Sequence, residues 1–345
     1  MDEPLLEVDD LTIQYQTPSG PLTAVSNASF TIEQGEYFGL VGESGSGKTT
    51  ILKSVLGSLD ENGSIVSGSI RFRGQELSTM SEAELNERIR WKEISWIPQS
   101  SMNSLDPLNR IGDKAVELAK VHTSLTEQEA LEQFRELFEI VGIDPERVSD
   151  YPHQFSGGMK QRAMIALALF LNPSLILADE PTTALDVIMQ DQVFEYLDGI
   201  RDEYEASMMF ITHDISAVFE LCDNMAIMHA GQVAESGSVT EVYDDPRHPY
   251  SILLQNSFPD IRYPDRELEE IGGHPPNMYG SVETCTFADR CPWAIEDCRA
   301  HAPMLEPLQS ADQTGDIHRA ACIRKNEVAE LYRAEHAANG GNVHE

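Results

Sequence analysis

Near its N-terminus the chain reads Gly42-Glu43-Ser44-Gly45-Ser46-Gly47-Lys48-Thr49, which fits the phosphate-binding pattern G-x-x-x-x-G-K-[ST]. The apolar run at residues 37–41 predicts a buried strand, and residues 48–56 have the apolar spacing of a helix. Glycines between a strand and a helix leave backbone N–H groups pointing into a concave site, and the helix N-terminus adds positive charge. The pattern therefore predicts a nucleotide site in which Lys48 contacts the β- and γ-phosphates and Thr49 holds Mg²⁺.

A second apolar strand, predicted at residues 174–180, ends in the adjacent carboxylates of Asp179 and Glu180. Strand residues alternate between faces, so the two carboxylates cannot do the same job. Asp179 suits the Mg²⁺ shell of a phosphate-loop enzyme, whereas Glu180 is placed to orient and deprotonate the attacking water. A solvated acidic pair before a turn at Pro181 is the alternative, and the apolar character of the strand argues against it. The two motifs together predict an NTPase.

Between these motifs lies Phe155-Ser156-Gly157-Gly158-Met159-Lys160-Gln161-Arg162, which resembles the signature motif of ABC ATPases. Four further marks of that family follow the expected pattern: Tyr15 as the aromatic that stacks on adenine, Gln99 in the Q-loop, Asp186 in the D-loop, and His213 as the switch histidine after an apolar strand. The resemblance covers residues 1 to about 240 without a gap.

The resemblance implies an α/β fold, a P-loop NTPase with a RecA-like parallel sheet, an antiparallel β-subdomain and a helical subdomain. It also implies ATP and Mg²⁺ as ligands, and it carries roles onto matching positions. ATP is expected to contact Tyr15, Gly42, Glu43, Ser44, Gly45, Ser46, Gly47, Lys48, Thr49, Thr50 and Gln99. Mg²⁺ is expected at Thr49, Gln99 and Asp179, with Glu180 and His213 as catalytic residues. Residues expected to act on the ATP of a second chain are Ser156, Gly157, Gly158, Met159 and Gln161 of the signature. Asp186 is expected to be the D-loop residue.

The sequence after about residue 240 indicates which group of ABC ATPases the chain resembles. His248-Pro249-Tyr250, then Gly273-His274-Pro275-Pro276-Asn277 and a cysteine-rich segment, resemble the D-type ATPase subunits of dipeptide and oligopeptide importers. That family implies ATP-driven dimer closure with a second ABC ATPase, expected to be a paralogue in a heterodimer. It also implies two membrane permease subunits and an extracellular substrate-binding protein. Oligosaccharide and nickel importers share this ATPase type, so they remain alternatives for the cargo.

A soluble ABC ATPase of translation or DNA repair is the competing class. Translation-type members carry two cassettes, whereas this chain has one, and repair-type members insert long coiled coils that this sequence lacks. A nucleotide-binding module without turnover is disfavoured because Glu180 and His213 are both present.

The amino-acid composition limits the kinds of partner that the protein can bind. The 58 acidic residues exceed the 24 basic ones and give a net charge of −34, which argues against nucleic-acid binding. The acidic excess favours a salt-adapted protein from a halophilic source, since salt screens self-repulsion, although an acidic mesophilic protein is the alternative. No apolar run is long enough to cross a bilayer, and the N-terminus lacks a targeting pattern. We expect a cytoplasmic protein held at the inner membrane face by permease subunits.

The pattern along the chain predicts an ATPase domain at 1–240, with a helical subdomain at about 100–155. Residues 5–35 are expected to form antiparallel strands, and Thr126 with Glu129 has the spacing of a capping box. Residues 241–326 predict a small appended Cys-rich domain, and 327–345 a helical tail with a frayed end.

Four of the five cysteines fall in the last fifth of the chain, at Cys285, Cys291, Cys298 and Cys322. Disulfides are disfavoured in the cytoplasm, and the spacing lacks the knuckle usual for zinc, which weakens zinc without excluding it. Four thiolates suit a [4Fe–4S] cluster, and the D-type subunits that the tail resembles carry one. Four unrelated thiols are the remaining alternative, whereas Cys222 is expected to be a small core residue.

Overall fold

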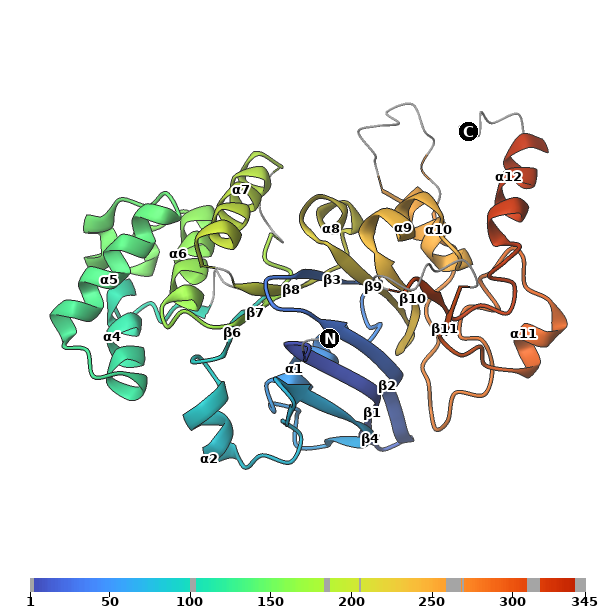
Figure 1. Cartoon of the computed structure of the whole chain (residues 1–345), viewed down its shortest axis with the longest axis horizontal. Coiled ribbons are helices and arrows are strands. Elements are labelled where there is room, and N and C mark those ends of the chain that lie inside the picture. Colours follow the sequence, from blue (N-terminus) through green and yellow to red (C-terminus); the bar gives the residue numbers. More distant parts are fainter. Residues whose placement is uncertain are drawn as a thin grey trace. The chain divides into compact units, whose positions relative to one another are not determined.

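The structure is a computed structural model that describes residues 3–99, 104–182, 187–204, 206–258, 268, 270–308 and 317–338. It divides into two compact units. The first unit comprises Met1–Thr31, Phe38–Ser78 and Thr212–Glu345, and the second comprises Ile32–Tyr37 and Thr79–Ile211. The elements are labelled in Figure 1.

The first unit contains β1 (Leu6–Thr17), β2 (Gly20–Ile32), β3 (Tyr37–Val41), α1 (Lys48–Val55), β4 (Gly63–Phe72), β5 (Gln75–Glu76), α8 (Ile215–Leu221), β9 (Asn224–His229), β10 (Gln232–Ser238), α9 (Val239–Asp244), α10 (Pro249–Asn256), α11 (Glu296–Ala300), β11 (Glu306–Pro307), β12 (Arg319–Ala320) and α12 (Val328–Ala338). The second unit contains α2 (Glu82–Glu84), the π-helix η1 (Leu85–Ile89), β6 (Ile94–Ile97), α4 (Ile111–His122), α5 (Glu127–Ile140), the 3₁₀ helices η2 (Pro145–Ser149) and η3 (Pro152–Gln154), α6 (Gly157–Leu169), β7 (Leu175–Asp179), α7 (Val187–Tyr204) and β8 (Ser207–Thr212).

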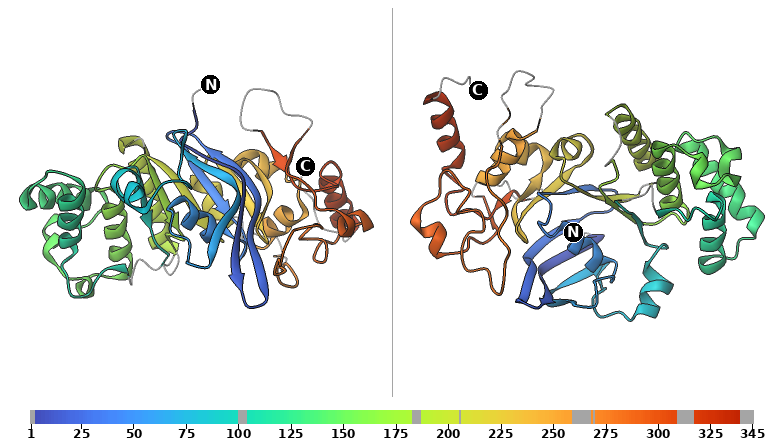
Figure 2. Two further views of the ribbon diagram at one scale, coloured as in Figure 1. Left: turned by 90° about the horizontal axis from the view of Figure 1, so that it is seen from below. Right: turned by 180° about the vertical axis from the view of Figure 1, so that it is seen from behind.

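An antiparallel sheet in the order β2-β1-β4-β5 confirms the strands expected near the N-terminus. Leu6 lies opposite Phe72 and Tyr15 lies opposite Gly63, and burial along β1 largely alternates, as expected for a sheet with one core face. The curved ribbons of this sheet are seen in Figure 2.

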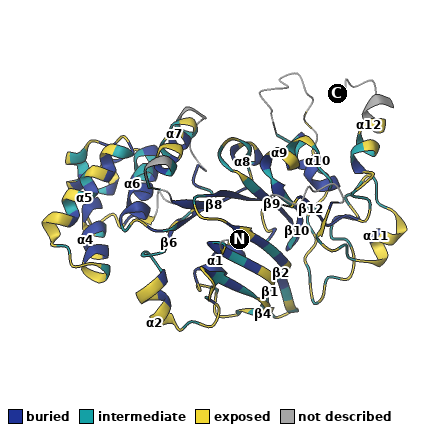
Figure 3. Ribbon diagram, in the orientation of Figure 1, coloured by how far each residue is buried: buried dark blue, intermediate teal, exposed yellow. Residues whose placement is uncertain are grey.

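The other sheet of the first unit runs β11-β12-β10-β9-β3. Strand β3 pairs in parallel with β9, and all of its residues are buried, as Figure 3 shows by colour. A side chain at Gly39 would clash with Val218 of α8, because a Cβ there would lie 2.2 Å from Val218 Cγ1. Helices α9 and α10 contact β10, and the apolar core between these elements includes Ile227, Tyr250 and Phe287.

Three parallel strands in the order β6-β7-β8 form the sheet of the second unit. Helices α4, α5 and α6 contact one another, and they bury Phe134, Phe138 and Phe170 in edge-on and tilted contacts. Thr126 and Glu129 form the predicted capping box of α5, which confirms a helical region within the range expected.

No helix in the described parts of the chain is long and apolar enough to cross a membrane. Cys222 is partly buried against the core cluster of the first unit. The predicted frayed end falls almost wholly beyond Ala338, outside the described residues.

Candidate functional site

The phosphate loop connects β3 to α1 as the sequence predicts. Lys48 is buried, and its Nζ donates to the carbonyl oxygens of Gly42 at 2.7 Å and Glu43 at 2.9 Å and to Ser46 Oγ at 3.3 Å. The loop carbonyls therefore hold the ammonium at the loop. A fixed cation beside backbone N–H groups at a helix N-terminus is suited to bind phosphate.

Two positions of this loop require glycine, because backbone carbonyl oxygens of other strands lie too close for a side chain. A Cβ on Gly42, at φ +154°, would lie 2.1 Å from the carbonyl oxygen of Met228. A Cβ on Gly47, at φ +105°, would lie 2.5 Å from the carbonyl oxygen of Ala24. Any larger residue would push the loop away from β9 and β2, so these glycines fix where the N–H groups point.

The other predicted nucleotide residues of the first unit lie around this loop or on its sheets. Ser44, Gly45 and Thr49 are exposed, and Thr50 is half-buried. Tyr15 is half-buried on β1 opposite Gly63, where a Cβ would meet the Tyr15 ring at 2.8 Å. Glycine at 63 therefore leaves room for the ring.

The predicted carboxylate pair lies in the second unit. Asp179 ends β7 with 4% of its surface exposed, and Glu180 follows with φ +47°, a left-handed conformation that is rare outside glycine. The Glu180 N–H donates to the Ile211 carbonyl at 2.7 Å, and Gln99 Nε2 donates to Glu180 Oε2 at 2.6 Å. The structure thus brings Gln99 and Glu180 together and holds Glu180 in a strained backbone, a feature common at active sites.

The signature segment opens α6. Ser156 is the N-cap and its Oγ accepts the Met159 N–H at 3.3 Å, while Gly157 is the first helical residue. A Cβ on Gly158 would lie 2.2 Å from Met189 Cε of α7, so glycine lets the two helices approach. Gln161 is buried. The helix begins with a row of N–H groups, which suits an anion.

The predicted site residues are divided between the two units. His213 directly follows β8 and is exposed in the first unit. Asp186 lies outside the described residues. Tyr15, the phosphate loop and His213 belong to the first unit, whereas Gln99, Asp179, Glu180 and the signature belong to the second.

Two residues that the motifs did not identify as site residues contact the phosphate loop. Tyr250 Oη accepts the Glu43 N–H at 3.0 Å, and Arg290 forms an ion pair with the Glu43 carboxylate. Tyr250 belongs to the His-Pro-Tyr stretch that the sequence singled out, but nothing in that stretch indicates what it contacts. No sequence signal links Arg290 to a loop so far away in the chain.

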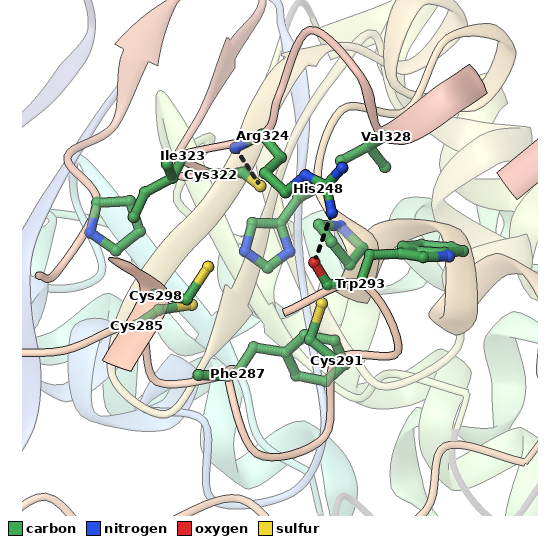
Figure 4. Close-up of a pocket in the computed structure, with 13 residues that line it drawn as sticks. His248, Cys285, Phe287, Cys291, Trp293, Cys298, Cys322, Ile323, Arg324 and Val328 are labelled. Atoms are coloured by element: carbon green, nitrogen blue, oxygen red, sulfur yellow. Dashed lines mark hydrogen bonds between the residues drawn. The ribbon is translucent and has the colours of Figure 1, made fainter. Parts of the chain in front are cut away.

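Cys285, Cys291, Cys298 and Cys322 line one small cavity of about 20 Å³ together with His248 (Figure 4). Hydrogen bonds from backbone N–H groups connect these cysteines to one another and to neighbouring residues. The Cys285 N–H donates to the Cys298 carbonyl at 3.0 Å, and the Arg324 N–H donates to Cys322 Sγ at 3.3 Å. The structure therefore gathers all four predicted cysteines at one place.

The donor set fits a thiolate-bound centre, but the thiols are not arranged as ligands. Among the described residues, no group of three or more His, Cys, Asp or Glu side chains is placed to hold a metal ion. Burial raises the pKa of Cys285, of Cys291 to about 11 and of Cys322 to about 12. These thiols are protonated at neutral pH, so binding a metal would release their protons.

Two family models match the chain. The model "ABC transporter" matches residues 25–183, and the model "Oligopeptide/dipeptide transporter, C-terminal region" matches residues 234–298. The second match includes three of the four cysteines of the cavity and ends before Cys322.

Relatives of known name resemble nearly the whole chain. The oligopeptide transport ATP-binding protein OppD of Salmonella typhimurium is 43% identical over 305 residues, which are 88% of this chain and 90% of that protein. The probable peptide ABC transporter ATP-binding protein y4tR of Sinorhizobium fredii is 40% identical over 331 residues, 95% of this chain and 97% of that one.

Solved structures of similar fold are ATP-binding cassettes. The dimeric post-hydrolysis state of the cassette MJ0796 bound to ADP and Pi has a TM-score of 0.60 and 26% identity, over 68% of this chain and 98% of that one. The structure of cbiO1 from Clostridium perfringens, part of the ABC transporter complex cbiONQ, has a TM-score of 0.60 and 25% identity, over 73% and 94%.

Proposed function

We propose residue roles for this chain from the premise that it belongs to the ABC family, among the ATP-binding subunits of oligopeptide transporters. As a member of that family it hydrolyses ATP and energises a peptide importer. The observation that supports the roles best is the phosphate loop, in which Lys48 Nζ is already fixed on the carbonyls of Gly42 and Glu43.

In this proposal residues 42–50 cradle the phosphates and Tyr15 stacks on adenine. Lys48 moves from the loop carbonyls to the β- and γ-phosphate oxygens, exchanging neutral acceptors for charged ones. Thr49, Gln99 and Asp179 would hold Mg²⁺, and the burial of Asp179 at the end of β7 supports its part in this.

Glu180 is the general base, and the Gln99 amide orients it through the 2.6 Å hydrogen bond. His213 contacts the γ-phosphate from the end of β8. A carboxylate held by an amide that also binds Mg²⁺ links metal binding to the orientation of the base. The strained backbone at Glu180 supports this role, because strained residues cluster at active sites, where the surrounding structure holds them in place.

Ser156, Gly157, Gly158, Met159 and Gln161 act on the ATP of a second subunit, which we propose is a paralogue, and Asp186 is the D-loop residue. The capped N-terminus of α6 supports the signature's part. Two permease chains hold the pair at the cytoplasmic face of the membrane, and an extracellular binding protein selects the peptide. We propose residues 1–240, with the helical part at about 100–155, as the ATPase, 241–326 as the domain that accompanies it, and 327–345 as a helical tail.

Co-purification and transport test this function. The chain, tagged and expressed with the permeases, binding protein and ATPase genes beside its own, should be recovered with two permeases and one paralogous ATPase. Proteoliposomes of that complex should accumulate a labelled oligopeptide when ATP is supplied on the ATPase side. Accumulation of an oligosaccharide or of nickel in place of peptide would contradict the proposed cargo, and a homodimer would contradict the paralogue.

Cys285, Cys291, Cys298 and Cys322 would hold a [4Fe–4S] cluster, supported by their common cavity and by four-thiolate chemistry. A bound cluster would crosslink a segment with little core of its own. Anaerobic purification, iron and sulfide analysis and a visible spectrum test this assignment. Stoichiometric zinc in colourless protein, or no metal, would contradict it.

A further inference from the structure

The side chain of Glu43, the second residue of the phosphate loop, is bound by a residue from far along the chain. Arg290 Nη1 donates to Glu43 Oε2 at 2.8 Å, and Arg290 Nη2 donates to Oε1 at 2.7 Å. Only 6% of the Arg290 side chain and 24% of the Glu43 side chain are exposed. Parallel charge-assisted bonds with little water are strong and fix the direction of both groups.

Contacts with residues outside the loop also hold the guanidinium in this position. Its Nε donates to the Gly272 carbonyl at 2.9 Å, and its Nη1 also lies 3.1 Å from His229 Nε2. The Phe287 ring lies 5.5 Å from the guanidinium carbon. Arg290 is thus held by contacts that do not involve the loop, so it can impose its position on Glu43.

The backbone of Glu43 is held as well. Its N–H donates to Tyr250 Oη, while its carbonyl oxygen accepts from Lys48 Nζ. Tyr250 is fully buried, and its own N–H donates to His248 Nδ1 at 3.0 Å. A shift of Glu43 would therefore move an acceptor of the phosphate-binding lysine.

Both contacts lead directly to the four-cysteine cavity. Arg290 precedes Cys291 in the chain, and His248 lines the cavity beside the thiols (Figure 4). Without Arg290, Glu43 would present an uncompensated, poorly solvated carboxylate in the loop that must accept a polyphosphate. Like charges repel strongly at a site of low dielectric, so nucleotide affinity would fall.

We propose that Arg290 is a positioning residue that neutralises Glu43, and that the four-cysteine segment sets the nucleotide affinity of the phosphate loop through it. The inference rests on the proposed nucleotide role of the loop. Ordering of the segment around Cys291 holds Arg290 on Glu43 and favours binding. Disorder of that segment withdraws the guanidinium, which exposes the nucleotide to the carboxylate.

Titration of the full-length chain with MgADP tests whether the Arg290 charge raises nucleotide affinity, since MgADP binds without being hydrolysed. Arg290→Met should raise the Kd about ten-fold, equivalent to ~1.4 kcal/mol. Glu43→Gln supplies the second background of the cycle, and its own Kd is the reference there. In that background Arg290→Met should change the Kd by less than about three-fold, because no unpaired carboxylate remains. Arg299→Met is the matched control, since its ion pair with the exposed Asp289 lies in the same segment at 3.7 Å.

A wild-type Kd in Arg290→Met would overturn the proposal, as would an equal loss when Arg290→Met is made in the Glu43→Gln background. If Arg290→Met melts below the assay temperature, Arg290→Gln replaces it. Glutamine keeps a hydrogen-bond donor but removes the charge, so the Kd should still rise about ten-fold, and a wild-type Kd in folded protein would refute neutralisation.

Cys291→Ser tests the link to the segment. It should raise the MgADP Kd in the wild-type background and change it little when Glu43→Gln is also present. Equal losses in both backgrounds, or no loss in either, would show that the segment does not act through Glu43. Failure of the wild-type chain to bind MgADP would instead contradict the proposed function itself, so the two failures are distinguishable.

Discussion

Strands β3 and β7 are alike up to their last residue and then differ completely. Each is a five-residue parallel strand with every residue buried. Strand β3 leads into a glycine loop with Lys48 fixed at its centre, whereas β7 ends in Asp179 and Glu180. In the proposed function, the end of β3 leads into the phosphate-binding loop of the first unit, whereas the end of β7 supplies a metal ligand and the general base in the second. The proposed roles therefore place the phosphate-binding lysine in one unit and the general base in the other.

The largest expected effect tests the chemistry assigned to the second unit. Glu180→Gln should lower ATP turnover about 10²- to 10⁴-fold, because the water loses its base, while MgATP affinity is kept. Steady-state hydrolysis measures the turnover, and nucleotide titration measures the MgATP affinity. Glu139→Gln, at an exposed position of α5 in the same unit, is the control and should behave as wild type. Substantial turnover by Glu180→Gln would remove the distinction between the two strand ends.

Binding in the first unit is tested at Lys48. Lys48→Ala should weaken MgATP affinity about 10- to 100-fold, since hydrogen bonds to charged groups are worth about 1.5–3 kcal/mol. Lys53→Ala on the same helix removes only an exposed ion pair with Asp60 and should change the affinity little. Equal affinities in the two variants would show that the ammonium held over the loop does not serve the nucleotide.

Salt should act on both units alike, because the charge of −34 is spread along the chain. Raising KCl from about 0.1 M to about 2 M should raise the melting temperature by about 5–10 °C, as screening relieves carboxylate repulsion. Trp91 and Trp96 lie in the second unit and Trp293 in the first, so Trp293→Phe restricts fluorescence to the second. A melt that is unchanged or lower at high salt would argue against the halophilic interpretation.

Acid should weaken the first unit in particular. Burial, with His248 and Arg290 nearby, lowers the pKa of His229 to about 3. The unfolded chain takes up this proton near pH 6.5, so the stabilisation present above that pH is lost as the pH falls toward 3. At about pH 5 the loss is roughly 2 kcal/mol.

Denaturant unfolding at about pH 7 and about pH 5 measures the effect of acid. His229→Gln should lose less stability between the two pH values than wild type, whereas the exposed control His274→Gln should match wild type. The same acid sensitivity in His229→Gln as in wild type would place the titrating group elsewhere.

The motifs could be read from sequence wherever their geometry is contiguous. Residues 37–49 predict strand, loop and helix because glycine freedom, apolar period and a terminal lysine act within a few residues. Strand β7 was predicted for the same reason. The expected start of the helical subdomain and the D-loop fall partly on residues outside the described ranges, so those expectations stay predictions.

The sequence by itself determined the two buried strands, the loop glycines and the family, because each depends on neighbours in the chain. Only the tertiary structure decided that Gln99 binds Glu180, that four separated cysteines share one cavity, and that Arg290 forms an ion pair with Glu43. These contacts join residues far apart in the chain, and no local propensity encodes such a pairing. Packing of the elements creates them, because buried polar groups must find partners wherever the fold brings them.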